Sequence, residues 1–263
     1  ASIPEEYGGG GGDFRHDMVI LQTWARLMAG GFSNSVHSGI VAQYILRYGT
    51  EWQKKKYLPK MATGEMVAAI AMTEPGAGTD LQAIRTSAKK DGDHYVINGA
   101  KTFITNGYHA NLVCIVARTG TEQGGKGISL IMAEVDGLEG FRRGKLLDKV
   151  GQHTIDTAEL FFDDMRVPVS NLLGTEEGRG FVQLMEQLPA ERLIIGVGGV
   201  ATMQRAIDET LAYVQQRHVF RRGHGACGFE CANERLRGRC TQKSAARASA
   251  QSACVSRAVL PLA

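Results

Sequence analysis

A short apolar run that ends in a Pro- and Gly-rich turn is the most constraining feature of this sequence. Residues 67–72 read Val-Ala-Ala-Ile-Ala-Met, and Thr73 precedes Glu-Pro-Gly-Ala-Gly at residues 74–78. Pro and Gly are strong turn residues, so we expect a strand that delivers Thr73 to a tight loop. Backbone N–H groups of a Gly-rich loop can approach a phosphate or carbonyl oxygen, and the hydroxyls of Thr73 and Thr79 add donors. The loop suits such a ligand, although an ordinary hairpin turn is the better explanation of these residues on their own.

The hydrophobic period changes twice along the chain. Before residue 65 it is helical in three stretches, with Ser33 and Thr50 as N-caps of the second and third: residues 14–29, 35–48 and 51–61. It then becomes strand-like, most clearly at 128–135 and 158–162, between the turn dipeptides Asp91-Gly92, Asn106-Gly107 and Gly124-Gly125. The helical period returns at 180–188 and 192–217, with Pro189 near the start of the last helix. We therefore expect a small antiparallel β domain between two helical regions.

Composition sets bounds on partners and size. The chain has 263 residues, 43% of them hydrophobic, which is enough for two or three packed units. No apolar run approaches the ~20 residues that a membrane-spanning helix needs. The net charge of +3 is too small to argue for nucleic-acid binding, and the excess lies in residues 221–263, where Arg and Lys far outnumber Glu230 and Glu234.

The cysteines divide the chain at the same point. Cys114 lies inside the apolar run 112–117, where a thiol is most simply a small buried hydrophobe. The other four lie near the C-terminus, at Cys227, Cys231, Cys240 and Cys254. A zinc site can be drawn from the first three with His224, but the second pair of ligands found in known zinc modules is absent. We expect no metal site.

Further motifs agree in order and spacing over residues 1 to about 220. They are Ile3-Pro-Glu-Glu-Tyr-Gly-Gly9, Tyr57-Leu-Pro59, Asn98-Gly-Ala-Lys101, Phe103-Ile-Thr-Asn-Gly107, Gly151-Gln152, Phe162-Asp-Asp164, Val167-Pro168, Glu191-Arg192 and Arg217-His-Val-Phe220. Together with Met72–Asp80, these motifs resemble those of the acyl-CoA dehydrogenase family. The resemblance implies an α+β multidomain fold: a partial N-terminal α-helical domain (1–65), a central antiparallel β domain (66–174) and a partial C-terminal helical bundle (175–220).

The resemblance also implies a chemistry. These enzymes use FAD to convert acyl-CoA thioesters into trans-2-enoyl-CoA, pass electrons to an electron-transfer flavoprotein-like acceptor, and form homotetramers. The residues that would contact FAD by resemblance are Met72, Thr73, Gly78, Thr79, Phe103, Ile104, Thr105, Arg217 and Phe220. Of these, Thr105 would lie near N5, Thr79 would also face the substrate, and Arg217 and Phe220 would reach the FAD of a neighbouring subunit. Taken singly, each hydroxyl or aromatic side chain is as consistent with ordinary β-domain packing.

Glu191 is the candidate catalytic base, with Arg192 beside it as a substrate-binding residue. In the long-chain and isovaleryl branches of the family the base precedes an Arg on a helix, and the segment Gln187–Leu193 matches that version. The match also favours long-chain-like or branched acyl groups. An ordinary Glu at a helix N-terminus, stabilised by the helix dipole, is the alternative. The dipole and an apolar pocket shift a carboxyl pKa in opposite directions, so we expect Glu191 to be ionised near neutral pH.

The resemblance stops after Phe220, where Arg221 replaces the Gly that the family has. A one-base insertion in the gene would explain this, since a shifted frame restores Gly-Glu-Ala-Met. The family also has a helical segment before Ile3, so we expect truncation at both ends and weakly held FAD. An inactive, cofactor-poor fragment is therefore the alternative function, and a zinc- or nucleic-acid-binding tail a more distant one. The compartment would be cytoplasmic in a bacterium and mitochondrial in a eukaryote.

We predict that limited proteolysis removes residues 221–263 before it cuts the β domain. This segment has few aromatic residues and much Arg, Ser, Ala and Gly. It therefore cannot bury enough apolar surface to offset an ordering entropy of ~1–2 kcal/mol per residue. Mass spectrometry of the early fragments checks the order of cleavage. Amide-exchange protection in this segment equal to that of residues 66–174 would contradict the prediction.

Overall fold

The computed structural model of the chain describes residues 1–29, 34–122, 124–219 and 222–223. Contacts divide the chain into two units, 1–203 and 204–263. In the second unit the described residues form the last part of a helix and a short hairpin, β8 (His218–Val219) with β9 (Arg222–Gly223). Ser33 and most of 220–263, including the four C-terminal cysteines, lie outside the described residues. Within the described ranges, no helix combines the length and apolarity needed to cross a bilayer.

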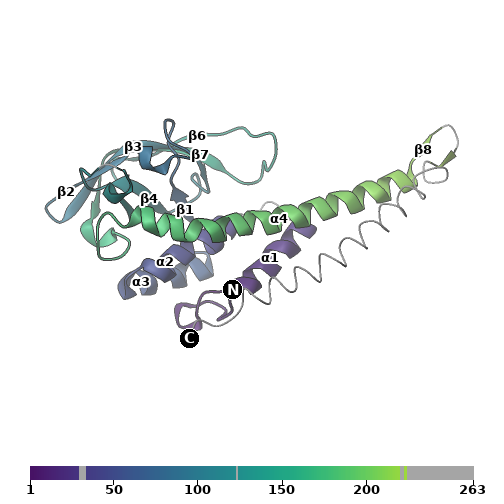
Figure 1. The fold of residues 1–263 in the computed structure, drawn as a ribbon, viewed down its shortest axis with the longest axis horizontal. Coiled ribbons are helices and arrows are strands. Elements are labelled where there is room, and N and C mark those ends of the chain that lie inside the picture. The colour runs from purple at the N-terminus through teal and green to yellow at the C-terminus, as the bar shows by residue number, and fades with distance from the viewer. Residues whose placement is uncertain (30–33, 123, 220–221, 224–263) are drawn as a thin grey trace. The chain divides into compact units, whose positions relative to one another are not determined.

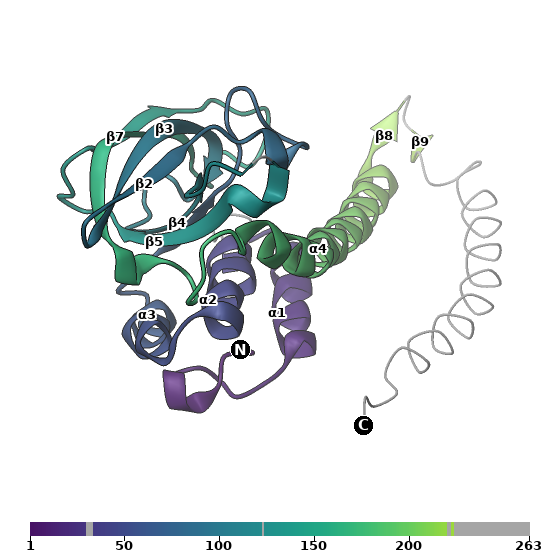
Figure 2. The ribbon, with the colours of Figure 1, turned by 60° about the vertical axis from the view of Figure 1, so that its left-hand side comes forward.

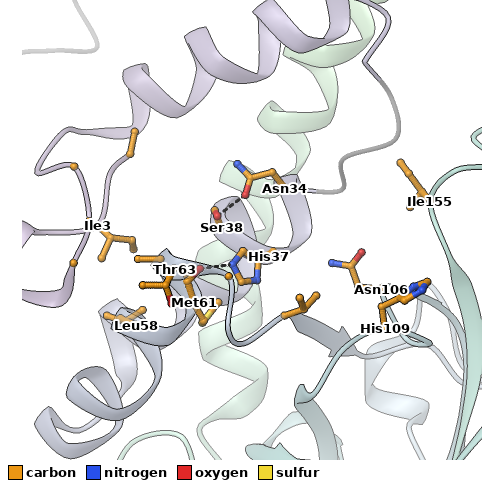
Figure 3. Close-up of a pocket in the computed structure, with 18 of the residues that line it drawn as sticks. Ile3, Asn34, His37, Ser38, Leu58, Met61, Thr63, Asn106, His109 and Ile155 are labelled. Atoms are coloured by element: carbon orange, nitrogen blue, oxygen red, sulfur yellow. Dashed lines mark hydrogen bonds between the residues drawn. The ribbon is translucent and has the colours of Figure 1, made fainter.

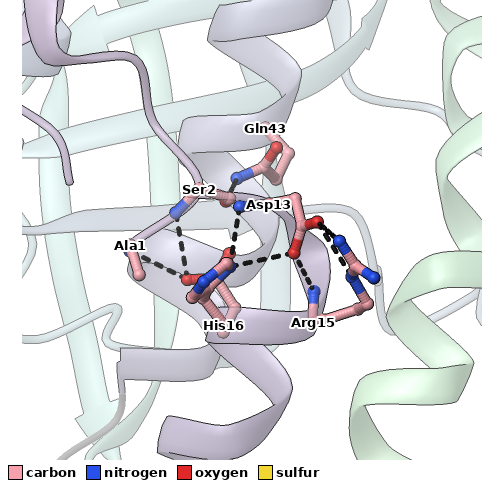
Figure 4. Close-up of polar contacts among 7 residues, drawn as sticks. Ala1, Ser2, Asp13, Arg15, His16 and Gln43 are labelled. Carbon is pink, nitrogen blue, oxygen red and sulfur yellow. Dashed lines mark hydrogen bonds and ion pairs between the residues drawn. The ribbon is translucent and has the colours of Figure 1, made fainter. Parts of the chain in front are cut away.

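Two helices of the first unit begin at side-chain caps. The helices of this unit are α1 (Phe14–Arg26), the π-helical segment η2 (Ser35–Val41), α2 (Ala42–Tyr48), α3 (Glu51–Thr63) and α4 (Gly180–Gln216), which runs on into the second unit (Figure 1). Asp13 caps α1 by accepting from the Arg15 amide, within a group of polar contacts drawn in Figure 4. Thr50 caps α3 by accepting from the Gln53 amide, as its sequence predicts.

Two helical predictions are corrected. The helix expected over residues 35–48 begins with a π-helical segment, which a hydrophobic pattern does not distinguish from α-helix because both place apolar residues on one face. The two helices expected at 180–188 and 192–217 form one continuous α4, with Pro189 inside it. Pro189 lies on the exposed side, whereas Gln187 and Glu191 lie on the buried side. Packing on the buried side thus continues past the proline, and water can reach the carbonyl that the proline leaves unbonded.

The β domain is one seven-stranded sheet. Its strands are β1 (Ala68–Ala71), β2 (Ser87–Asp91), β3 (His94–Thr105), β4 (Leu112–Arg118), β5 (Ile128–Glu134), β6 (Phe141–Leu146) and β7 (Thr157–Pro168). Four pairings are antiparallel, including the β2–β3 hairpin at the predicted Asp91-Gly92 turn. The pairings of β1 and β2 with β4 are parallel, so the sheet is mixed rather than wholly antiparallel. The turn after β1 leads into a loop and not directly into a neighbouring strand, so β1 pairs with β4, which lies further along the chain.

Side chains alternate between two hydrophobic cores along β1 and β4. On β1, Ala68 and Ile70 pack with the helices, whereas Ala69 and Ala71 pack inside the β domain. The same division holds on β4, where Cys114 faces the helices and is buried, as predicted. Figure 2 shows the curled sheet above α2 and α3 in this unit. Because both faces of β1 and β4 are covered, their period-2 pattern reads as a continuous apolar run.

Gln53 joins the helices to the β domain. Its amide nitrogen donates to the carbonyl oxygens of Ser170 at 3.1 Å and Leu172 at 2.7 Å, and its side chain is fully buried. Its oxygen accepts from the Thr50 amide, so one side chain both completes the cap of α3 and satisfies two carbonyls after β7.

We predict that Gln53→Leu lowers the free energy of unfolding by about 1–3 kcal/mol, because buried carbonyls lose their donor. Urea denaturation measures the change. Lys55→Leu, at an exposed position of the same helix, is the control and should stay within about 0.5 kcal/mol of the parent. Equal effects of the two substitutions would show that the bridge contributes nothing.

Candidate functional site

The predicted loop after β1 is a tight turn closed by its own backbone. The Glu74 amide donates to the Ala77 carbonyl at 2.8 Å, and the Ala77 amide donates to the Glu74 carbonyl at 3.1 Å. Pro75 and Gly76 form the tip. A Cβ placed on Gly76 or Gly78 would meet no atom within 4 Å. The outer side of the turn is therefore open to an incoming group, as the sequence predicts for a ligand-binding loop.

A buried ion pair holds this turn against the sheet. Lys101 Nζ lies 2.9 Å from Glu74 Oε1 and donates to the Met72 carbonyl at 2.9 Å. The Glu74 carboxylate also accepts from the amides of Arg85 and Thr86, at 2.8 and 2.9 Å. Four hydrogen bonds, from Lys101 on β3 and from two amides just before β2, thus fix the backbone on both sides of Thr73.

Burial and charge act in opposition on this pair. Burial lowers the pKa of Lys101 to about 8, and the Glu74 carboxylate counteracts that fall. Burial acts to raise the pKa of Glu74, but hydrogen bonds from Thr86 and the charge of Lys101 outweigh it and leave this pKa below its ordinary value. Near pH 7 both groups are therefore charged, and each depends on the other for its solvation.

A β-bulge turns Phe103 outward beside the turn. The pairing of β3 with β7 shifts between Lys101 and Ile104, and Phe103 has a φ of 59° in the left-handed region. Its side chain is 67% exposed. The Thr102 amide donates to the Thr73 carbonyl at 2.9 Å, so the bulge and the turn lie side by side. Bulges often re-aim a side chain next to a functional site, and this one presents an aromatic face.

The structure brings together seven of the predicted cofactor residues in two adjacent stretches, 72–79 and 103–105. Met72 and Thr73 are half-buried, and Gly78 and Thr79 are exposed. Thr105 is half-buried. Ile104 differs, because its side chain packs in the core of the β domain and leaves only its backbone for a ligand. An exposed aromatic ring, threonine hydroxyls and an open Gly-containing turn thus come from neighbouring segments, and such groups can contact a planar ring and phosphate oxygens.

Glu191 lies in the interior of α4 and not at a helix start, so the prediction of dipole stabilisation is wrong. Its side chain is 8% exposed. Burial raises its pKa, against the lowering effects of the Tyr44 hydrogen bond and of Arg192, whose side chain is exposed. The Tyr44 hydroxyl on α2 donates to Oε1 of Glu191 at 2.7 Å. A buried carboxyl whose pKa is raised by its surroundings is typical of the groups that transfer protons in enzymes.

The β1–β4 strand pair connects Glu191 to the turn. Cys114 on β4 interacts electrostatically with Glu191, and burial raises the pKa of its thiol to about 12. In the parallel register Cys114 pairs with Ile70 on β1, two residues before Met72. The base candidate is therefore electrostatically coupled to the strand pair that carries the turn.

The remaining predicted residue in the described ranges is Arg217. In the second unit its guanidinium donates to the Tyr213 hydroxyl at 2.7 Å and lies over the same ring, 5.8 Å from its centroid. Phe220 lies outside the described residues. Among the residues that are described, no three His, Cys, Asp or Glu side chains are grouped to hold a metal ion.

A cavity of about 790 Å³ opens elsewhere in the first unit (Figure 3). Its lining includes His37 on η2, Asn106 at the end of β3, and the Gly8–Gly10 loop. His37 is held by the Met61 carbonyl and the Ala68 amide, at 3.0 and 3.1 Å. None of the predicted cofactor or catalytic residues lines this cavity.

Sequence reasoning missed two participants in the site. Tyr44 fell within an apolar helical pattern, and nothing local distinguishes it from other core aromatics. Lys101 stood in a quoted motif, but its pairing with Glu74 depends on the turn after β1 lying beside β3, which is distant in sequence. A Lys inside a strand pattern that is otherwise half-buried was the available signal, because a lysine is rarely fully buried without a partner.

We predict that Lys101→Met lowers the free energy of unfolding by about 3–5 kcal/mol, because it leaves the Glu74 carboxylate buried without its cation. Chemical denaturation measures this. Lys54→Met, which breaks the more exposed pair with Glu51, is the control and should cost less than about 1 kcal/mol. Adding Glu74→Gln to Lys101→Met should restore part of the loss. A loss no larger than that of the control would contradict this account.

Comparisons with known proteins agree with this geometry. Residues 1–65, 69–165 and 178–253 match the N-terminal, middle and C-terminal domains of acyl-CoA dehydrogenases. The last match extends beyond Phe220, where the quoted motifs end.

Individual relatives are similar over most of the chain. The long-chain specific acyl-CoA dehydrogenase of Sus scrofa mitochondria is 47% identical over 221 residues, or 83% of this chain and 51% of the relative. Isovaleryl-CoA dehydrogenase of Pongo abelii is 38% identical over 222 residues, 83% of this chain and 52% of the relative. A crystal structure of an acyl-CoA dehydrogenase from Geobacillus kaustophilus has 44% identity and a TM-score of 0.85, over 94% of this chain and 64% of that one. This chain spans about half the length of the curated relatives it matches, and it belongs to the acyl-CoA dehydrogenase family.

Proposed function

We propose that this chain carries the catalytic residues of an FAD-dependent dehydrogenase that converts acyl-CoA thioesters into trans-2-enoyl-CoA. The observation that carries the proposal is the buried Glu191 carboxyl with its raised pKa, next to the strand pair that leads to the open turn. Relatives that act on long-chain acyl-CoA and isovaleryl-CoA favour long-chain-like or branched acyl groups.

The proton step falls to Glu191. In the proposed reaction its carboxylate takes a proton from the α carbon of the thioester, and a hydride leaves the β carbon, so that a carbon–carbon double bond forms. A general base works best when its pKa approaches the working pH. Burial moves Glu191 in that direction from the ordinary carboxyl value.

The surface at residues 72–79 and 103–105 would hold the cofactor. When bound there, FAD would supply the hydride acceptor. The exposed ring of Phe103 offers an aromatic contact for a flat ring system, and the Thr73 and Thr79 hydroxyls offer donors. Thr79 would also contact the substrate, together with the exposed Arg192.

The partners of the whole protein follow from the family as proposals. They are an acyl-CoA substrate, an electron-transfer flavoprotein-like acceptor, and further copies of the chain in a tetramer. Arg217 and Phe220 would then reach FAD bound to a neighbouring copy. Flavin absorbance of the purified chain, titrated with FAD and then mixed with a long-chain acyl-CoA, tests binding and reduction separately.

We predict that Glu191→Gln lowers the rate of flavin reduction by acyl-CoA at least ~10²-fold, because the amide keeps the shape of the side chain but has no basicity. FAD binding should be nearly unchanged. Stopped-flow absorbance measures the rate. Glu186→Gln, at a solvent-accessible position on the same helix, is the control and should keep the parent rate. If Glu191→Gln reduces its flavin as fast as the parent, the base is another residue.

The pH dependence of this rate has a defined sign. The carboxyl must be ionised to take the proton, and its pKa is raised above the ordinary value of 4.5. We therefore predict that the rate falls on acidification through a pKa above 4.5, while FAD remains bound. A rate that is constant down to pH 4.5, with the fold intact, would exclude a buried carboxyl as the base.

A further inference from the structure

Among the described residues, Tyr44 is the one that forms a hydrogen bond with the side-chain carboxylate of Glu191, the proposed base. Its hydroxyl donates to Oε1 of Glu191 at 2.7 Å, and no other hydrogen bond joins this carboxylate to the described residues. Tyr44 is fully buried on α2, and Glu191 comes from α4, so the contact spans two helices far apart in sequence.

The packing around this contact leaves little freedom to either side chain. A Cβ on Gly39 of η2 would lie 3.1 Å from Cδ1 of Ile194, one turn after Glu191, so the missing side chain lets α4 approach closely. The ring of Tyr44 packs against that of Tyr48, with centroids 6.1 Å apart. The hydroxyl is thus carried on a buried ring that is packed between helices.

The groups that face Glu191 keep their charge state over a wide pH range. The Cys114 thiol approaches from β4 with a pKa raised to about 12 by burial, and it stays neutral. Burial, together with the Glu191 charge, also raises the pKa of Tyr44, so its hydroxyl remains a donor. Arg192, on the same helix as Glu191, is exposed and always charged. Among these groups Glu191 alone is a carboxyl, and its pKa is raised above the ordinary value by burial.

We propose that Tyr44 is the positioning residue for Glu191: its hydroxyl holds Oε1 and leaves Oε2 to accept the substrate proton. This inference rests on the proposed function, because it concerns the orientation of Glu191, the base named there. A carboxylate with one oxygen held has a single orientation for proton transfer, and orientation contributes directly to rate. The same hydrogen bond favours the charged form and opposes the effect of burial. Tyr44 therefore both aims the base and keeps it ionised.

The first test needs neither flavin nor substrate. The side-chain carboxyl carbon signal of Glu191, assigned by its loss in Glu191→Gln, is titrated by NMR in the parent, Tyr44→Phe and Tyr48→Phe chains. We expect its pKa to rise by about one pH unit in Tyr44→Phe, as the loss of one charge-assisted hydrogen bond implies. Tyr48→Phe is matched, since its hydroxyl lies 2.7 Å from the partly exposed Glu186, and should leave Glu191 unchanged. No shift in Tyr44→Phe, or equal shifts in both variants, overturns the proposal.

The second test is the pH profile of flavin reduction in the FAD-loaded chain. Tyr44→Phe should move the acid limb to higher pH by the same amount and lower the limiting rate at high pH about tenfold or more, with KM for acyl-CoA little changed. A uniform loss at every pH indicates a structural role and overturns the proposal. If no variant, the parent included, reduces flavin while the NMR shift is present, the proposed function fails and the Tyr44–Glu191 contact stands.

A reciprocal measurement covers the case in which Tyr44→Phe does not fold. The ring carbon that bears the Tyr44 hydroxyl should change its NMR shift in the parent chain as Glu191 titrates, with the same midpoint. That change should vanish in Glu191→Gln. A Tyr44 signal that does not follow the Glu191 titration overturns the proposal.

Discussion

The buried charge of Lys101 determines how the ends of three strands meet. One ammonium group binds the Met72 carbonyl at the end of β1 and the Glu74 carboxylate after it, and that carboxylate in turn holds the amides that lead into β2. A buried ammonium is tolerated only when such partners surround it. These contacts fix the turn after β1 beside the segment of β3 that carries the bulge at Phe103.

The electrostatics of the turn differ from those of Glu191. At the turn, opposite charges cancel locally, so the surface offered to a ligand consists of hydroxyls, backbone and an aromatic ring. At Glu191 a single carboxyl is left with one neutral donor in an apolar surrounding. The first arrangement gives rigidity and the second gives a shifted proton affinity. The β1–β4 pair connects them, because its two faces belong to different cores.

Much of this could be predicted from local sequence, and the failures share one cause. Thr50 and the turn at Pro75-Gly76 depend on neighbouring residues, and both were predicted. The continuity of α4 through Pro189 depends on which side of the helix is covered, and that is a tertiary property. The contact of Tyr44 with Glu191, and the bulge that exposes Phe103, also depend on packing between distant segments. Family motifs identified Glu191 as the base candidate, but only the fold shows what surrounds it.

The parallel pairing of β1 with β4 has a consequence for the order of folding. A parallel pair cannot form as a local hairpin, and all of β2 and β3 lies between these two strands. The β2–β3 hairpin closes a loop of a few residues, so its entropic barrier is far lower. β1 therefore joins a sheet that is already partly assembled, and the turn that follows it is fixed late. A ligand that binds this turn would then find its site complete only in the last steps of folding.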